Sequence, residues 1–510
     1  MSGTLGFKYF PSMQWRPSGT NIEFDASQAN TATQNQRALL IGQITSAGSA
    51  QPNVPVQGYS QNQVNLLCGA NSMLAQLYAQ YRVQDPFGEV WLGPLSDNSA
   101  GTAASGTITI TGTASAAGTL ALYVMGIAVP VPVNLGDTPT VIAGNVAAAV
   151  VIATTPTGLV LPLTASAAAG VVTLTAIHKG LAMNDIDLRV NYIGVQNSEV
   201  LPAGVTVAFS NPVTGSSAGT FSGGATNPVL TTLLGNLGVQ LFDFIACPYS
   251  DSASLLALQT FLGDQAGRWS AEEMLYGHVF YAFRGTVSAR STFGVSRNDQ
   301  HASCIGYFDS PTPAWLEAAD WCAVHAVRIK VNPAQGLATQ ALGLLPPPLL
   351  NQDTPGERNT LLFDGISTFT VDAAGVCRID RTITTYQQNP SGQPDNSYLN
   401  TNIMFQAMYA ARYIAAQVTS QFIASGKILV VDGTPIPPGS PATTPSAMLG
   451  AVIGIYAYLC SIFITQNAAI FARNAYAQPG TKGQVLMYLP IDFSDQVINV
   501  GILVQFRQST

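Results

Sequence analysis

One stretch of the chain carries almost no charge, and it constrains the fold more than any other feature. Residues 98–177 contain a single charged side chain, Asp137, and are dominated by Thr, Ala, Gly and Val. In residues 106–112 and 118–124, larger apolar side chains alternate with small or polar ones with a period of two. This alternation is typical of strands with one buried face. A helix is expected after Asp137, because this residue or the next can cap it and Pro139 suits a first turn. We therefore predict a compact, mostly β module with one helix.

Further strands are predicted after that helix, and they complete the module. The segments with strand character are residues 159–163, 171–175, 186–192 and 205–209. Residues 215–224 are rich in Gly and Ser, so we expect a connector without regular structure there.

Strands and helices alternate on either side of this module. Before it, strands are predicted at residues 37–42 and 89–93, with a helix over residues 65–83 between them. After it, the predicted elements are strands at 242–247, 278–283 and 304–308, and helices at 252–262 and 313–328. Such alternation favours a parallel or mixed α/β layer.

The two ends of the chain differ from its middle. Prolines interrupt residues 1–26, whose one alternating segment, residues 21–25, has no local core to bury it. Toward the other end, residues 343–350 predict a stiff linker, residues 402–422 a long helix, and residues 497–506 an isolated apolar strand. We therefore predict an extended arm at each end.

These patterns predict an α+β multidomain protein. Its core is expected to be an α/β structure that carries a mostly β insertion domain and extended N- and C-terminal arms. The predicted segments are an arm at 1–26, a first core part at 27–95, the β insertion at 96–225, an α/β core part at 226–345, a C-terminal domain at 346–490 and an arm strand at 491–510.

Composition excludes several classes of function. Only 9% of the residues are charged, with 20 basic against 27 acidic side chains, which is unsuited to binding a phosphate backbone. The apolar run at residues 448–464 is shorter than the roughly 20 residues of a membrane-spanning helix, so a buried helix is the better interpretation. We expect neither nucleic-acid binding nor membrane insertion.

The best candidate metal site combines His301 and Cys304 with Cys322 and His325. Two such pairs have the side chains that a tetrahedral zinc ion requires. Against this, Cys304 starts an apolar strand, Cys322 lies in an apolar helix, and free Cys is common in protein cores. We therefore favour ordinary packing for these residues and expect no metal.

Two charged pairs are the remaining candidates for chemistry. Glu272 and Glu273 could act as an acid and a base, but an exposed helix end explains them better. Glu357 and Arg358 have no other titratable cluster beside them, which favours a structural ion pair or a surface contact.

Six cysteines are scattered along the chain, too sparsely for a disulfide-stabilised scaffold. Buried free thiols are one interpretation, and disulfides, including bonds between subunits of a particle released into an oxidising medium, are the other. The cysteines concerned are Cys68, Cys247, Cys304, Cys322, Cys377 and Cys460.

A series of motifs resembles one protein family. Residues 356–372 read Gly-Glu-Arg-Asn-Thr-Leu-Leu-Phe-Asp-Gly-Ile-Ser-Thr-Phe-Thr-Val-Asp, and residues 378–387 read Arg-Ile-Asp-Arg-Thr-Ile-Thr-Thr-Tyr-Gln. This closely resembles the signature of Mu-like contractile tail sheath proteins of bacteriophages. Further similar motifs lie at 178–180, 184–190, 242–251, 283–286, 297–301, 310–315 and 472–475. The chain departs from the family near residues 426–470, where a more charged helical segment is expected.

The resemblance implies a structural role without catalysis, and we expect no cofactor. Such proteins stack as hexameric rings around a tail tube in a metastable extended helix, and contract to drive the tube through the host envelope. The implied partners are further copies of this chain, the tail tube protein, and the baseplate and tail terminator proteins. The implied location is the virion tail, after assembly in the host cytoplasm, with the β insertion facing outward.

The resemblance also implies how subunits are linked. Arms of such proteins complete a sheet in neighbouring subunits, and strand addition supplies main-chain hydrogen bonds for this. The residues expected in these intersubunit strands are Ile22, Phe24, Ile498, Val500, Ile502, Val504 and Phe506.

Two other classes of function compete with this interpretation. The Thr-, Ala- and Gly-rich module also suits an extracellular adhesin or a surface-layer-like structural protein, although residues 1–11 lack the pattern of a secretory signal. A zinc hydrolase using His301 and Cys304 is the other alternative. The number and order of the motifs favour the sheath protein.

Overall fold

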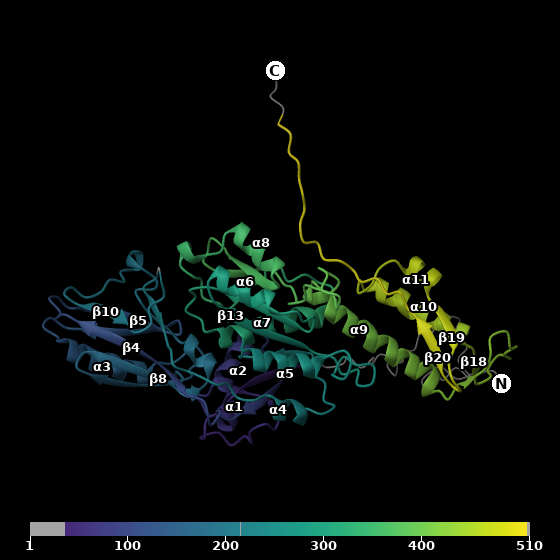
Figure 1. Cartoon of the computed structure of the whole chain (residues 1–510), viewed down its shortest axis with the longest axis horizontal. Coiled ribbons are helices and arrows are strands. Elements are labelled where there is room, and N and C mark those ends of the chain that lie inside the picture. The colour runs from purple at the N-terminus through teal and green to yellow at the C-terminus, as the bar shows by residue number, and fades with distance from the viewer. Residues whose placement is uncertain (1–35, 215, 507–510) are drawn as a thin grey trace, which may run out of the picture. The chain divides into compact units, whose positions relative to one another are not determined.

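The central element of the fold is a largely parallel β-sheet. The structure, a computed structural model, describes residues 36–214 and 216–506. Within these residues the sheet has eight strands in the order β16-β15-β14-β13-β12-β1-β3-β2. Figure 1 labels one of them, β13. Pairings from β15 through β3 are parallel, and only the outermost strands, β2 and β16, run antiparallel to their neighbours. The strands are β1 (Arg37–Gln43), β2 (Val56–Gly58), β3 (Glu89–Leu95), β12 (Phe244–Ala246), β13 (His278–Arg284), β14 (Ala302–Tyr307), β15 (Ile366–Val371) and β16 (Cys377–Arg381).

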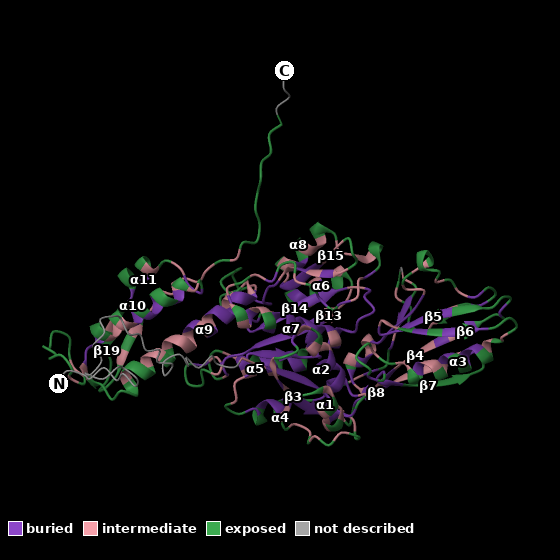
Figure 2. Ribbon diagram, turned by 180° about the vertical axis from the view of Figure 1, so that it is seen from behind, coloured by how far each residue is buried: buried purple, intermediate pink, exposed green. Residues whose placement is uncertain are grey.

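Helices cover this sheet and bury its strands. Every residue of β14 is buried, and β1 is buried from Ala38 onward, as expected for a parallel sheet covered on both faces (Figure 2). Helix α7 packs on β12 and β13 and against α2, while α6 and α8 pack near β15. The helices are α1 (Gln61–Cys68), α2 (Met73–Gln84), α4 (Thr231–Asn236), α5 (Ser252–Leu262), α6 (Val287–Val295), α7 (Ala314–Val331) and α8 (Pro355–Phe363).

The single helix predicted over residues 65–83 is wrong, because α1 and α2 are separate helices. Gly69 follows α1 with a φ of 89°, a left-handed conformation that ends a helix and favours Gly. Ser72 then caps α2, since its side chain accepts a hydrogen bond from the Ala75 N–H at 3.1 Å. Helix α6, which the sequence analysis missed, starts in the same way at the Thr286 cap.

Residues 103–220 form the predicted β-rich structure. In the described part of the chain they build two four-stranded antiparallel sheets, β10-β4-β8-β7 and β11-β9-β5-β6. The helix after Asp137 is confirmed as α3 (Pro139–Ile152), with Pro139 in its first turn. The strands are β4 (Ala103–Thr111), β5 (Gly118–Val124), β6 (Ile127–Val133), β7 (Leu163–Ala168), β8 (Val171–Lys179), β9 (Asp187–Val190), β10 (Thr206–Phe209) and β11 (Ala218–Thr220).

Two local predictions in this region are wrong. The strand expected at residues 159–163 begins only at Leu163, because the preceding segment makes just one isolated bridge, between Thr154 and Val160. The connector expected at 215–224 contains the short strand β11, which gains its structure by pairing with β9. Gly and Ser content indicated a loop, but tertiary pairing overrides that local preference.

A buried ion network joins β9 to the central sheet. Asp187 accepts hydrogen bonds from Arg189 Nε at 2.7 Å and from Arg284, the last residue of β13. Arg189 Nη2 also donates to the carboxylate of Asp309 at 2.7 Å, and Asn351 donates to the other oxygen of Asp309 at 2.6 Å. Arg189 is 2% exposed, and both aspartates are fully buried. These charges are therefore neutralised by one another and not by solvent.

The last part of the chain is mostly helical. It contains α9 (Thr401–Val418), α10 (Pro445–Ser461), α11 (Ala468–Asn474), and the short strands β17 (Ile428–Leu429), β18 (Ala442–Thr443), β19 (Tyr476–Pro479) and β20 (Val485–Tyr488). The apolar run at 448–464 forms most of α10 and buries one face, which agrees with a buried helix. None of the described helices has both the length and the apolar character needed to cross a membrane.

The predicted segment boundaries relate to this topology in two ways. The β-rich sheets fall within the predicted insertion at 96–225. In contrast, the boundary between 345 and 346 separates β14 from β15, which pair in parallel at Cys304 and Ile366. The division into six segments stays a prediction.

Candidate functional site

The region around α10 and α11 has its own small hydrophobic core. Buried Val452 and Tyr456 on α10 pack with Phe471 on α11 and with Ala475 just after it. The rings of Tyr456 and Phe471 lie parallel, with centroids 3.7 Å apart. Met487 of β20 packs against this cluster, so the core supports one face of the β19–β20 hairpin.

The β19–β20 hairpin is a ribbon with open edges. It pairs Tyr476 with Tyr488 and Pro479 with Val485, and among the described residues no third strand joins it. Its outer face carries apolar side chains, since Tyr476, Tyr488 and Leu486 are each more than half exposed. A two-stranded ribbon is marginally stable in water unless it packs on other structure or gains strands. Both edges are therefore suited to accepting another strand.

The chain that follows the hairpin is held firmly until residue 494. Thr465 and Phe493 form an isolated antiparallel bridge. Around it, the Gln466 N–H donates to Asp492 O at 2.9 Å and the Ser494 N–H donates to Ile464 O at 3.2 Å. We call residues 492–494 the anchor.

Beyond the anchor, the chain is extended and exposed. Residues 497–506, the terminal segment, pair with no strand within the described part of the chain (Figures 1 and 2). Over residues 36–214 and 216–506, no strand pairs with the terminal segment, so the strand predicted here stays a prediction. Its predicted interacting residues are 52–94% exposed, and they are Ile498, Val500, Ile502, Val504 and Phe506. The other two, Ile22 and Phe24, lie outside the described residues.

The structure does not gather the candidate zinc ligands into a site. His301 Nε2 contacts Asp264 at 2.9 Å, and His325 Nδ1 contacts the Trp321 carbonyl at 2.8 Å. Cys304 and Cys322 are fully buried, as ordinary packing predicts. Among the residues that the structure describes, no group of three His, Cys, Asp or Glu side chains could hold a metal ion.

The candidate charged pairs have separate structural surroundings. Glu272 and Glu273 are exposed in a turn and not at the helix end that was predicted. Glu357 completes a capping box, in which its carboxylate accepts from the Thr354 N–H at 2.8 Å and the pKa of Glu357 is lowered. Arg358 instead pairs with Asp380 at 3.0 Å, so the two neighbours do not bind each other.

All six cysteines are free thiols in the single chain, and five of them are buried. Burial raises the pKa of Cys68 and of Cys247 to about 12, which leaves little of the thiolate that attacks a disulfide. Cys460 is the one partly exposed cysteine. Disulfide bonding stays a prediction, and these environments favour the free-thiol interpretation.

Because the cysteines are mostly buried free thiols, we expect a monomer band when assembled particles are denatured without reductant in the presence of a thiol-blocking reagent. Buried thiols cannot reach a partner in a neighbouring subunit, so gel electrophoresis should give the same pattern with and without reductant. A dimer band that disappears in Cys460→Ser would instead identify Cys460 as an intersubunit bond.

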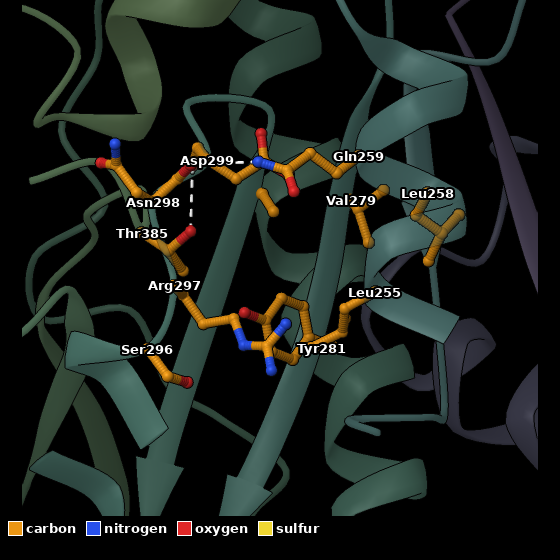
Figure 3. A pocket seen from close by; sticks show the side chains of 11 residues that line it. Leu255, Leu258, Gln259, Val279, Tyr281, Ser296, Arg297, Asn298, Asp299 and Thr385 are labelled. Atoms are coloured by element: carbon orange, nitrogen blue, oxygen red, sulfur yellow. Dashed lines mark hydrogen bonds between the residues drawn. The ribbon is translucent and has the colours of Figure 1, made fainter. Parts of the chain in front are cut away.

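One small pocket lies between α5 and the loop that precedes β14 (Figure 3). Its volume is about 50 Å³, enough for a few water molecules. Two hydrogen bonds close its polar side, from Gln259 Nε2 to Asn298 O at 3.1 Å and from Thr385 Oγ1 to Asp299 O at 3.0 Å. Burial raises the pKa of Asp299, and the neighbouring His301 lowers it. The pocket is too small for a cofactor.

Sequence reasoning missed the hairpin and the anchor. The alternation of exposed Tyr476, Leu486 and Tyr488 with half-buried neighbours was a signal for the hairpin, but Pro479 and Gly480 obscure it. The anchor had no signal, since Ile464, Gln466 and Ser494 are ordinary residue types, and α11 and the hairpin separate the partners in the sequence.

Comparison with known proteins identifies the class. Residues 223–385 match the family described as the phage tail sheath protein central domain. Over 458 residues the chain is 31% identical to the Mu-like prophage FluMu tail sheath protein of Haemophilus influenzae, with 89% of each chain covered. The chain therefore belongs to the family of phage tail sheath proteins and is similar to its Mu-like members.

Two solved structures are also similar at low sequence identity. The sheath tail protein of Desulfitobacterium hafniense is 12% identical with a TM-score of 0.45, covering 93% of this chain and 100% of that one. A chain of the contracted-state baseplate of the anti-feeding prophage is 11% identical with a TM-score of 0.44, covering 96% and 97%.

The family makes this chain a structural subunit of a contractile phage tail sheath and a component of the virion tail. The alternative of an adhesin or surface-layer-like protein is set aside by the same finding. Members are structural proteins, consistent with the expectation of no enzymatic role.

Proposed function

We propose that the terminal segment links neighbouring copies of this chain by adding a strand to their β19–β20 hairpins. One observation supports the proposal most directly. The terminal segment is apolar, extended and exposed, and it pairs with no strand within the described chain. Leaving this much apolar surface in water is unfavourable, at about 25 cal/mol for each Å². Pairing with a neighbouring copy would bury this surface and remove the free-energy cost of exposing it.

The chemistry of the segment suits strand addition. Ile498, Val500, Ile502, Val504 and Phe506 alternate with other residues and would lie on one face of an added strand. The hairpin offers a matching surface, since Met487 packs on the local core and Ala477, which pairs with Met487, lies on the same face. Main-chain hydrogen bonds would then give affinity, and the alternate side chains would fix the register.

In this proposal the subunits form stacked hexameric rings around the tail tube protein, bounded by baseplate and tail terminator proteins. The N-terminal arm, with Ile22 and Phe24, makes a second link, and assembly takes place in the host cytoplasm. The β insertion faces outward from the sheath. Contraction repacks subunits as rigid bodies while the strand links persist, and it releases energy stored in the metastable extended lattice to drive the tube through the host envelope.

Deletion of residues 497–510 is expected to abolish sheath assembly and leave a folded, soluble chain. The segment makes no strand pairing within the described part of the subunit, so its loss should not affect the core. Electron microscopy and sedimentation of the purified chain measure the outcome.

A matched control exchanges Ile498→Val and Val500→Ile, which keeps the β-branched character and should assemble normally. Tubular sheaths of ordinary length from the truncated chain would rule the proposal out.

A further inference from the structure

We propose that Gln406 and the anchor fix the base of the terminal segment to the subunit. A force that a neighbouring subunit applies to the segment is then transmitted through them to the rest of this subunit. The inference rests on the proposed function, in which the segment pairs with a neighbouring copy. It assigns a positioning role to Gln406, a residue far from the segment in sequence.

Gln406 holds the anchor with both of its amide hydrogens. This α9 residue is 1% exposed, and its Nε2 donates to Ile464 O at 3.2 Å and to Ser494 O at 3.0 Å. The amide therefore bridges the two chain segments that the Thr465–Phe493 bridge brings together. Both hydrogens of this NH₂ group are satisfied by carbonyl acceptors, one of them on the buried Ile464 and the other on the half-buried Ser494.

Tyr456 closes the opposite side of the anchor. Its hydroxyl donates to Gln466 O at 2.7 Å and accepts from the Asp492 N–H at 3.1 Å. The ring itself is held by stacking on Phe471, so the hydroxyl position is fixed by the local core. The anchor is thus attached to α9 and α10 independently.

The connection continues from α9 to the central sheet. Asn402 lies one helical turn before Gln406, and its amide donates to Pro333 O at 2.8 Å and to Gln335 O at 2.7 Å, just beyond α7. On the same helix, Phe405 stacks on Phe244 of β12 with ring centroids 5.0 Å apart. The buried side-chain amides of Asn402 and Gln406, on one side of α9, therefore connect the base of the terminal segment to the part of the subunit that contains the central sheet.

Loss of the anchor would lengthen the segment. Residues 492–494 precede the exposed chain, and if released they would add about 10 Å of extended backbone. That slack is about two strand spacings, so a neighbouring copy could no longer be held at a fixed distance.

The test uses the full-length chain with Gln406→Leu, and independently with Tyr456→Phe. Amide hydrogen exchange at Asp492 and Ser494 is measured in the unassembled chain, and sheath yield and helical order are measured by electron microscopy. The matched control is Gln417→Leu, a partly exposed glutamine of the same helix whose side chain accepts a hydrogen bond from Gln421.

We expect about tenfold faster exchange at Asp492 and Ser494 in both variants, because each loses hydrogen bonds worth about 1–2 kcal/mol. We also expect fewer and less ordered sheaths, with the control unchanged. Wild-type yield and order despite faster exchange would overturn the inference, as would unchanged exchange in both variants. Failure of the proposed function is distinguished by the truncated chain, which would then assemble normally whatever happens at Gln406.

Discussion

Replacement of Arg189 by Met is expected to destabilise the folded chain by about 3–5 kcal/mol, because it leaves the buried carboxylate of Asp309 without a counter-ion. Arg189 donates to both Asp187 and Asp309, and each aspartate is fully buried. Arg284 would still compensate Asp187, so the main penalty falls on Asp309. Chemical denaturation of the unassembled chain measures the change in the free energy of unfolding.

A second substitution tests whether the uncompensated charge of Asp309 causes this loss of stability. Adding Asp309→Asn to Arg189→Met removes the uncompensated charge and keeps the hydrogen-bonding shape, so about 1–3 kcal/mol of the loss should return. The matched control is Arg378→Met, because Arg378 pairs with Asp372 but is 39% exposed, and its loss should cost less than about 1 kcal/mol. Equal losses at Arg189 and Arg378 would show that burial of the network is not what matters.

Replacement of Glu317 by Gln is expected to make the stability of the fold less dependent on pH. Glu317 is fully buried on α7, and neither carboxylate oxygen has a hydrogen-bond partner in the described chain. Burial, and then the nearby Asp320, raises the pKa of Glu317 well above 4.5, so the folded chain keeps the acid protonated. The unfolded chain ionises it near its ordinary pKa.

Glu317 is protonated in the folded chain and ionised in the unfolded chain, and this difference sets the direction in which pH changes stability. Above pH 4.5, unfolding releases a proton from Glu317, so the free energy of unfolding falls by about 1.4 kcal/mol for each pH unit up to the folded pKa. Below pH 4.5 this contribution is fully present. The Glu317→Gln variant lacks it, so its free energy of unfolding should rise relative to that of the wild type as the pH increases from about 4.5 toward the folded pKa.

Denaturant unfolding across that range measures the difference, with the exposed Glu273→Gln substitution as the control. A constant offset between the wild type and the Glu317→Gln variant at every pH would show that Glu317 ionises normally in the folded chain.

Local elements could be predicted from the sequence where short-range rules apply. The alternation around Leu120 identifies β5, and the Asp137–Pro139 signal identifies the start of α3. The same rules missed the break at Gly69, because apolar residues continue at helical spacing on both sides of it. Periodicity reports which face is buried and does not report where one helix ends and the next begins.

The candidate site could be predicted only in part. The run of alternating apolar residues ending in Phe506 is a local pattern that predicts a strand without a local partner, and the resemblance to sheath proteins adds the expectation that this strand joins a neighbouring subunit. The anchor joins Gln406 to Ser494, and the buried ion network joins Arg189 to Asp309, so both depend on contacts across about a hundred residues. Polar residues of these types occur equally in exposed positions, and only the assembled fold shows which of them are buried.

The position of β1 in the sheet bears on how the chain is made. Its Ala38 pairs with Val90 of β3 soon after synthesis begins, but its other edge stays unpaired until Phe244 of β12 has been made. At usual ribosomal rates that interval is about 10–30 s, during which a buried strand has an open edge. The intervening β4–β11 sheets share no strand with the central sheet and can fold meanwhile. Nascent chains are therefore expected to need protection from aggregation mainly in that interval.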